Sequence, residues 1–264
     1  MQRSVDLEEM RVNKSIALSA GTALLVIGLA APLAAAERWS IGLTANDAPI
    51  EALVVPAADS APTVLLMGGL QGPDPSVDAV RREVEAFERQ PLARRAFRLI
   101  AVPLANPDAV TLQFPPSGTA YRDNAESHVL WRWIGIHAPD LVLIAGGGDA
   151  PLATALSQNA VGLVGRIPTR TVPIQAGMLQ SLPTPIAVSD AHRELDRRRS
   201  RSPRAVADEL AKVYGDDFTQ PTYILAMALI AQMRLGNTAE VLRLAEPYLN
   251  GSQDPFAKIG RAHV

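Results

Sequence analysis

Thr63-Val64-Leu65-Leu66-Met67-Gly68-Gly69 is the stretch that decides the fold, because a short apolar run ends there at a pair of glycines. A continuous apolar run of this length predicts a strand buried on both faces, as in a parallel sheet. Segment 76–90 then carries apolar residues at helical spacing, namely Val77, Val80, Val84 and Phe87. The apolar run 97–102 predicts the next strand, so this region reads strand, helix, strand.

The alternation of strands and helices continues on both sides of this region. Residues 126–137 are predicted to be a helix, and 140–145 another apolar strand that stops at Gly146-Gly147-Gly148. Upstream, 39–55 alternates loosely around Asn46-Asp47 and predicts a hairpin. We therefore expect an α/β fold, with a mixed but mostly parallel sheet flanked by helices. In such sheets, sites form in the loops at the carboxyl ends of the strands.

Composition excludes several classes of protein and site. Hydrophobic residues make up 48% and charged residues 20% of the 264 residues, which is typical of a globular protein with a core. The net charge of −2 does not favour nucleic acid as a partner. Because the chain has no cysteine, disulfides, zinc–cysteine sites and cysteine nucleophiles are excluded.

The N-terminus, residues 1–36, has the features of a secretory signal. Arg11 and Lys14 precede an apolar run, which ends in small residues before Glu37. We expect cleavage after Ala36 and a periplasmic or secreted protein, with translation starting at Met1 or Met10. A retained membrane anchor is the alternative, because the run nearly reaches spanning length. With cleavage, no stable membrane span is expected.

The C-terminal quarter differs in composition from the rest. Residues 37–190 are predicted to form the α/β domain, and 191–258 a truncated helical segment that begins at a helix capped by Asp190. Residues 259–264 back-translate to the start of a sequencing adapter, so we expect them to be an artefact. The helices either begin a repeat of helical hairpins or begin a larger helical barrel.

The order of segments from Trp39 to about Ala150 resembles the zinc carboxypeptidase (carboxypeptidase A-like) family. Residues 65–74, LLMGGLQGPD, lie where the family has a strand, a glycine and then His-x-x-Glu. Residues 102–109, VPLANPDA, are similar to its Asn-Pro-Asp-Gly segment, and 139–143 to the strand before its third zinc ligand. The resemblance implies a zinc site of two histidines and a glutamate, with an open position for water.

The sequence departs from the family pattern at each zinc-ligand position. Gln71 lies at the first histidine, Asp74 at the glutamate, and Gly146 at the third ligand, or Ala145 if the register slips. Glutamine is a poor zinc ligand, and glycine and alanine offer no side-chain ligand. The resemblance therefore implies a degenerate member, for which we expect no cofactor, or zinc if the site is retained.

Two other sets of residues are candidates for function. Gln71 and a loop with Tyr121, Arg122 and Asn124 are predicted to contact the ligand, because Arg122 could pair with a carboxylate at two points. Ordinary loop and helix-cap chemistry is the alternative for that loop. The acid–base candidates are Asp74, Asp108 and Glu126, since burial can separate the pKa values of neighbouring carboxylates.

Three hypotheses about function follow. The first is an exported, catalytically degraded carboxypeptidase-like domain that binds a peptide or another small carboxylate ligand. The second is an active metallocarboxypeptidase or amidohydrolase-type hydrolase with an altered site. The third places the activity in a missing C-terminal helical domain, similar to a glycan hydrolase, because residues 223–229, YILAMAL, are rich in alanine and leucine.

Overall fold

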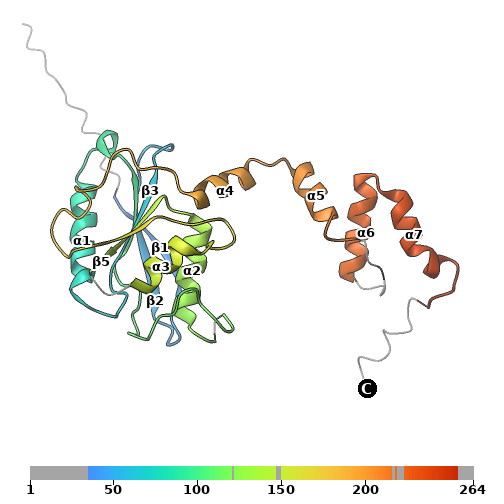
Figure 1. Ribbon diagram of the computed structural model, residues 1–264, viewed down its shortest axis with the longest axis horizontal. Helices are drawn as coiled ribbons and strands as arrows, with labels where there is room; N and C mark the ends of the chain where they lie inside the picture. The colour runs from blue at the N-terminus through green and yellow to red at the C-terminus, as the bar shows by residue number, and fades with distance from the viewer. Residues whose placement is uncertain (1–34, 121, 147–149, 216–217, 219–222, 255–264) are drawn as a thin grey trace, which may run out of the picture. The chain divides into compact units, whose positions relative to one another are not determined.

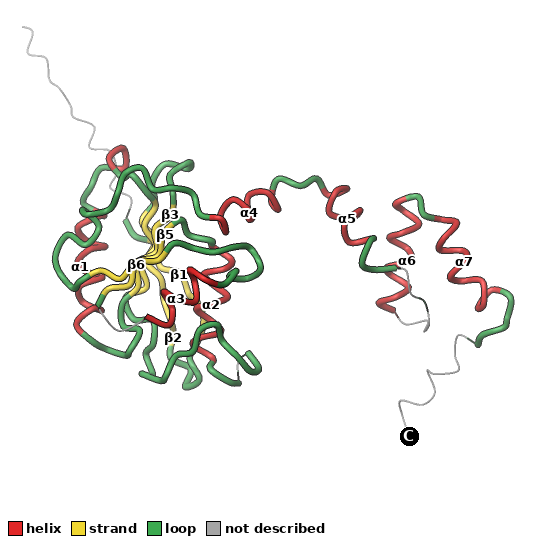
Figure 2. Tube along the Cα trace, in the orientation of Figure 1, coloured by secondary structure: helices red, strands yellow, loops and turns green. Residues whose placement is uncertain are grey.

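The computed structural model describes residues 35–120, 122–146, 150–215, 218 and 223–254. Most of the predicted signal and all of the adapter-like end, 259–264, lie outside these residues. A six-stranded sheet in the order β1-β2-β4-β3-β5-β6 forms the centre of the α/β domain (Figures 1 and 2). No helix in the described part of the chain is long and apolar enough to cross a membrane.

The sheet is mixed, with its antiparallel pairs on one side. Its strands are β1 (Glu37–Leu43), β2 (Pro49–Val55), β3 (Thr63–Met67), β4 (Arg98–Val102), β5 (Leu141–Ala145) and β6 (Thr169–Val172). β2 pairs antiparallel with both β1 and β4, whereas the pairs β4–β3, β3–β5 and β5–β6 are parallel. The predicted α/β class and the mostly parallel sheet are therefore confirmed.

Helices cover both faces of the sheet because successive strand residues point to opposite sides. On one face α1 (Pro75–Glu88) packs through Val80, Val84 and Phe87 against Leu66 and its neighbours in the sheet. On the other face lie α2 (Ala125–His137) and α3 (Ala150–Gln158). They contribute the buried residues Leu130, Trp133, Ile134, Leu152 and Leu156. Strand β5, and β3 after Thr63, consist of apolar residues, so both faces of these strands must be covered by helices to be buried, as the apolar runs predict.

Helix α4 (Asp190–Arg199) packs on the core of the α/β domain through Ala191 and Leu195. Its cap is Ser189, whose hydroxyl accepts a hydrogen bond from the backbone N–H of His192 at 3.0 Å, so the prediction that Asp190 is the cap is wrong by one residue. The sequence patterns also did not predict α3 and β6, since neither contains a long apolar run.

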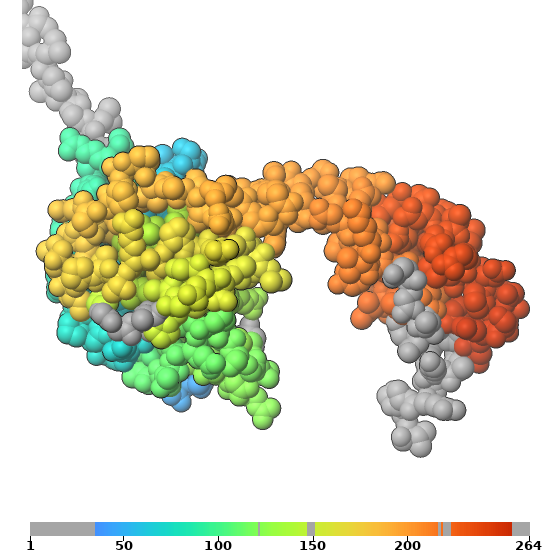
Figure 3. All heavy atoms as spheres, viewed as in Figure 1, coloured from blue at the N-terminus to red at the C-terminus, as the bar shows by residue number. Residues whose placement is uncertain are grey.

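The C-terminal helices are α5 (Pro203–Ala211), α6 (Tyr223–Leu235) and α7 (Thr238–Leu249), and α6 packs on both α5 and α7. Only Leu229, Gln232 and Val241 are buried in these three helices. Large apolar side chains remain exposed on α6, which is red in Figure 3, namely Tyr223, Ile224, Met227, Ile230 and Met233. These helices alone therefore bury little apolar surface.

Candidate functional site

The loops that follow β3, β4 and β5 leave the sheet at one edge. Met67 pairs with Val102 of β4 and with Ile144 of β5, so the three parallel strands end at the same level. The β1–β2 turn lies at this edge too, because β2 runs antiparallel to β4. This is the carboxyl edge at which α/β proteins bind their ligands.

Asn106 joins the loop after β3 to the loop after β4. Its side chain is fully buried, and its amide nitrogen donates to the carbonyls of Leu70 at 3.0 Å and Val110 at 2.8 Å. Its amide oxygen accepts from the backbone N–H of Val110 at 3.2 Å. The backbone N–H of Asn106 also donates to Gly69 at 3.0 Å. The Asn-Pro-Asp segment thus positions both loops.

Asp74 caps helix α1. Its carboxylate accepts from the backbone N–H of Ser76 at 2.7 Å and from the Ser76 hydroxyl at 2.5 Å. The same hydroxyl accepts from the backbone N–H of Gly69 at 2.7 Å. Gln71, between these residues, is exposed. The carboxylate at the second predicted ligand position therefore already has a structural role.

Gly146 follows β5, and its backbone N–H donates to Val172 at 2.8 Å. Its φ of +92° favours glycine, and a Cβ added there would lie 3.3 Å from the side chain of Ile174. Among the residues predicted at the three ligand positions, Asp74 alone has a carboxylate, and this carboxylate is engaged as a helix cap. Among the described residues no group of three histidines, cysteines or acidic residues could hold a metal.

Asp108 and Glu126 both hold the β1–β2 turn. Asp108 accepts from the backbone N–H and the side-chain amide of Asn46, at 3.3 and 3.0 Å. Glu126 is buried, and its carboxylate accepts from the backbone N–H of Ala45 at 3.1 Å. Two of the acid–base candidates are therefore brought to neighbouring residues of one turn, while Asp74 lies at the start of α1.

The predicted ligand loop leads into α2. Tyr121 lies outside the described residues, and Arg122 is exposed. Asn124 occupies the cap position of α2 but makes no side-chain cap bond, and its amide lies 3.4 Å from Gln113 Oε1. His128 Nε2, one turn further along α2, lies 3.2 Å from the carbonyl of Ser117.

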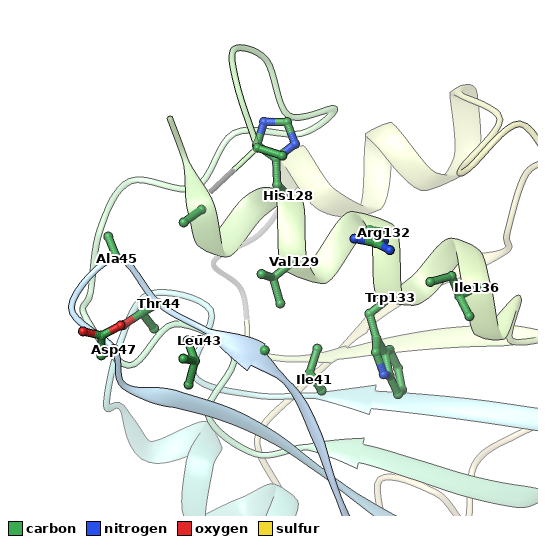
Figure 4. A pocket seen from close by; sticks show the side chains of 13 residues that line it. Ile41, Leu43, Thr44, Ala45, Asp47, His128, Val129, Arg132, Trp133 and Ile136 are labelled. Carbon is green, nitrogen blue, oxygen red and sulfur yellow. The ribbon is translucent and has the colours of Figure 1, made fainter. Parts of the chain in front are cut away.

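A pocket of about 670 Å³ lies between the end of β1 and α2, beside this loop (Figure 4). Val129 and Trp133 point from α2 toward the strand, where Ile41 and Leu43 form the opposite wall. The remaining lining residues are Gly42, Thr44, Ala45, Asp47, Ala120, Ala125, His128, Arg132 and Ile136. The pocket is mainly apolar, with Arg132 and Asp47 as its charged groups.

The sequence analysis did not single out this pocket, although one pattern could have indicated it. Val129 and Trp133 are four residues apart, so they share a face of α2. Only the structure places β1 opposite that face, because β1 is far from α2 in sequence.

Two other histidines lie outside the pocket. His137 packs against the rings of Trp133 and Trp39, with ring centroids 4.2 and 5.5 Å apart, and burial lowers its pKa from the ordinary value of 6.5, with further lowering from Arg98 and Arg199. His192 Nδ1 lies 2.8 Å from the buried carboxylate of Asp140, which ties α4 to the sheet.

Comparison with known proteins gives likeness in structure alone, since no family model and no curated protein matches the chain. A metallo-carboxypeptidase from Burkholderia cenocepacia is 17% identical over 44% of this chain and 37% of its own, with a TM-score of 0.37. One from Pseudomonas aeruginosa is 17% identical over 61% of each chain, also with a TM-score of 0.37.

A succinylglutamate desuccinylase/aspartoacylase from Rhodobacter sphaeroides is 22% identical over 42% of this chain and 38% of its own, with a TM-score of 0.31. The chain thus spans less than two thirds of the length of each of these structures. Metallo-carboxypeptidases, the family that the sequence resembles, are also among the proteins to which its fold is similar.

Proposed function

We propose that the α/β domain is a catalytically degraded carboxypeptidase-like domain, which binds a peptide or another carboxylate ligand in the pocket between β1 and α2. The observation that carries the proposal is the pocket itself, with its apolar walls and Arg132 at the rim. Its volume of about 670 Å³ is in the range of small-molecule sites, which combine apolar walls with a few polar groups.

The chemistry of the rim favours a carboxylate. The guanidinium of Arg132 can bind both oxygens of a carboxylate, while Trp133 and Val129 contact an apolar neighbouring group. Degeneracy is supported by the role of Asp74 as a helix cap and by the backbone of Gly146. The signal-like residues 1–36 support a periplasmic or secreted location.

Calorimetry with N-acetyl-leucine and its uncharged amide tests this proposal. Arg132→Gln should weaken binding of the acid by about tenfold, because one charge-assisted contact is lost. The amide should bind more weakly than the acid, and the substitution should leave its binding unchanged. Arg82→Gln, on the exposed side of α1 across the sheet, is the matched control and should bind like wild type. Equal binding of the acid by both variants would contradict the proposed site.

Metal analysis separates this proposal from an active metallohydrolase with an altered site. The purified domain should contain less than stoichiometric zinc and should not cleave N-acylated amino acids when zinc is added. Stoichiometric zinc with turnover would instead favour the hydrolase. Loss of that turnover in Asp108→Asn or Glu126→Gln would then assign the acid–base role.

A second function is supported by the exposed apolar side chains of α6. We propose that α5–α7 belong to a larger helical domain, similar to a glycan hydrolase, in which further helices cover Tyr223, Met227 and Ile230. Three helices with so few buried residues have little apolar burial to stabilise them. Determining the gene sequence beyond the codon for Lys258 and assaying the gene product on oligosaccharides tests this proposal, and a stop codon directly after Lys258 would contradict it.

A further inference from the structure

Strand β1 has a free edge in the described part of the chain. It pairs with β2 on one side and is the last strand of the sheet. An edge strand presents backbone N–H and C=O groups that can pair with another extended chain. Charged residues lie only at its start, Glu37 and Arg38, whereas residues 40–43 are Ser-Ile-Gly-Leu, with an irregularity in the pairing with β2 between Ser40 and Gly42. This uncharged end of the edge strand is the part that lines the pocket.

Helix α2 lies over this uncharged end. A Cβ on Gly42 would be 2.8 Å from Val129, so the helix approaches the strand as closely as a glycine allows. Beyond that contact two apolar side chains remain half exposed, Leu43 at 52% on the strand and Ile136 at 50% on the helix. The pocket is therefore a slot with a strand as one wall and a helix face as the other (Figure 4).

We propose that this slot holds an extended peptide segment, which adds to the sheet as a strand beside β1. The proposal rests on the proposed function and names its ligand class. Backbone pairing with residues 40–43 supplies affinity, and every second side chain of the peptide enters the slot. A free C-terminus is not required, because the contacts are to the backbone and to side chains.

The charges at the rim define the peptide further. Arg132 lies on the helix beside Trp133, and Asp47 lies in the turn after β1, at the other end of the slot (Figure 4). A complementary segment carries an acidic side chain at the Arg132 end, a basic one at the Asp47 end and an apolar one between. These side chains are two residues apart, because alternate residues of a strand point to the same face.

A single peptide fits the slot better than a second copy of this chain. Pairing between two β1 edges would bring a second sheet and a second α2 helix to a slot that α2 already covers at Val129.

The peptide acetyl-Asp-Thr-Leu-Thr-Lys-amide and its charge-reversed form, with Lys first and Asp last, test the proposal by calorimetry. We expect wild type to bind one of them at least tenfold more tightly than the other. The double variant Arg132→Glu with Asp47→Lys should reverse that preference. The dissociation constants of a peptide N-methylated at both Thr residues and of one N-methylated at Leu should differ at least tenfold. The reason is that successive N–H groups of a strand point to opposite sides, so only one set pairs with β1.

Each outcome decides one of the proposals. Binding that tolerates all N-methyl groups equally would overturn strand addition. If N-acetyl-leucine binds and neither peptide does, the inference fails and the proposed function stands; if none binds, both fail. A dimer in light scattering that Leu43→Lys dissociates would show that a second copy occupies the edge, and would also overturn the inference.

Discussion

Asn106 offers a test of how the loops at the carboxyl edge are held. The change Asn106→Ala removes an amide that joins the loop after β3 to the loop after β4. Two donated hydrogen bonds and one accepted hydrogen bond are lost, at distances between 2.8 and 3.2 Å. The backbone hydrogen bonds of residue 106 are unaffected, so the effect isolates the side chain.

The expected cost follows from the burial of the partners. The residue Leu70 is 6% exposed, and leaving its carbonyl without a donor should cost about 1–3 kcal/mol. Val110 is 38% exposed, so water can replace the lost partners of its backbone groups, at about 0.5–1 kcal/mol in total. We therefore expect the free energy of unfolding to fall by about 1.5–4 kcal/mol.

Urea unfolding followed by tryptophan fluorescence measures this change within the α/β domain. All three tryptophans, Trp39, Trp131 and Trp133, belong to that domain. Gln113→Ala is the matched control, because it deletes an amide whose contacts to Ser117 and Asn124 are exposed, and it should change stability by less than about 0.5 kcal/mol. An Asn106→Ala protein as stable as the control would refute the reasoning.

Three further predictions concern packing, capping and pH. Gly42→Ala should destabilise the domain by about 1–3 kcal/mol through contact with Val129, and Val129→Ala should restore part of that loss in the double variant, as chemical denaturation would show. Asp74→Ala should cost about 1 kcal/mol as a lost helix cap, whereas Asp74→Asn should stay within about 0.5 kcal/mol of wild type; a larger loss for the asparagine would argue against capping as the main role. Because the pKa of His137 is lowered in the folded state, its contribution to stability is present above pH 6.5 and decreases as the pH falls through that value, where the unfolded chain takes up the proton first. The urea concentration at the midpoint of unfolding should fall between about pH 7.5 and 5.5, and this fall should be smaller in His137→Phe than in wild type. An equal fall in both proteins would show that other groups cause it.

Much of the domain could be predicted from apolar runs and helical spacing. The β1–β2 hairpin, β3, α1, β4, α2 and β5 all lie within a few residues of their predicted positions. Two elements, α3 and β6, could not be predicted in this way. Strand β6 contains Thr169, Arg170 and Thr171 and is half exposed at the other edge of the sheet. A strand of this kind is specified by its pairing with β5 more than by its own pattern.

The candidate site was less predictable than the fold. The pattern after β3 directed attention to the carboxyl edge, where the carboxylates of Asp74, Asp108 and Glu126 accept hydrogen bonds from backbone N–H groups of a helix start and of the β1–β2 turn. A carboxylate in a loop can serve a backbone or a substrate, and only the position of its hydrogen-bond partners distinguishes the two. The roles of Arg122 and Gln71 as ligand contacts stay predictions.

Sequence patterning alone was sufficient for the α/β class, because β5 and all of β3 after Thr63 are apolar, and such strands are buried between two layers of helices. The resemblance also predicts Gln71, Asp74 and Gly146 at the positions of zinc ligands, and this assignment stays a prediction. The pocket depended on tertiary structure, since Leu43 and Arg132 are 89 residues apart and meet only after β1 has paired at the edge of the sheet and α2 has packed across it. Contacts between residues so far apart in sequence depend on how whole layers pack, and a local sequence pattern does not predict them.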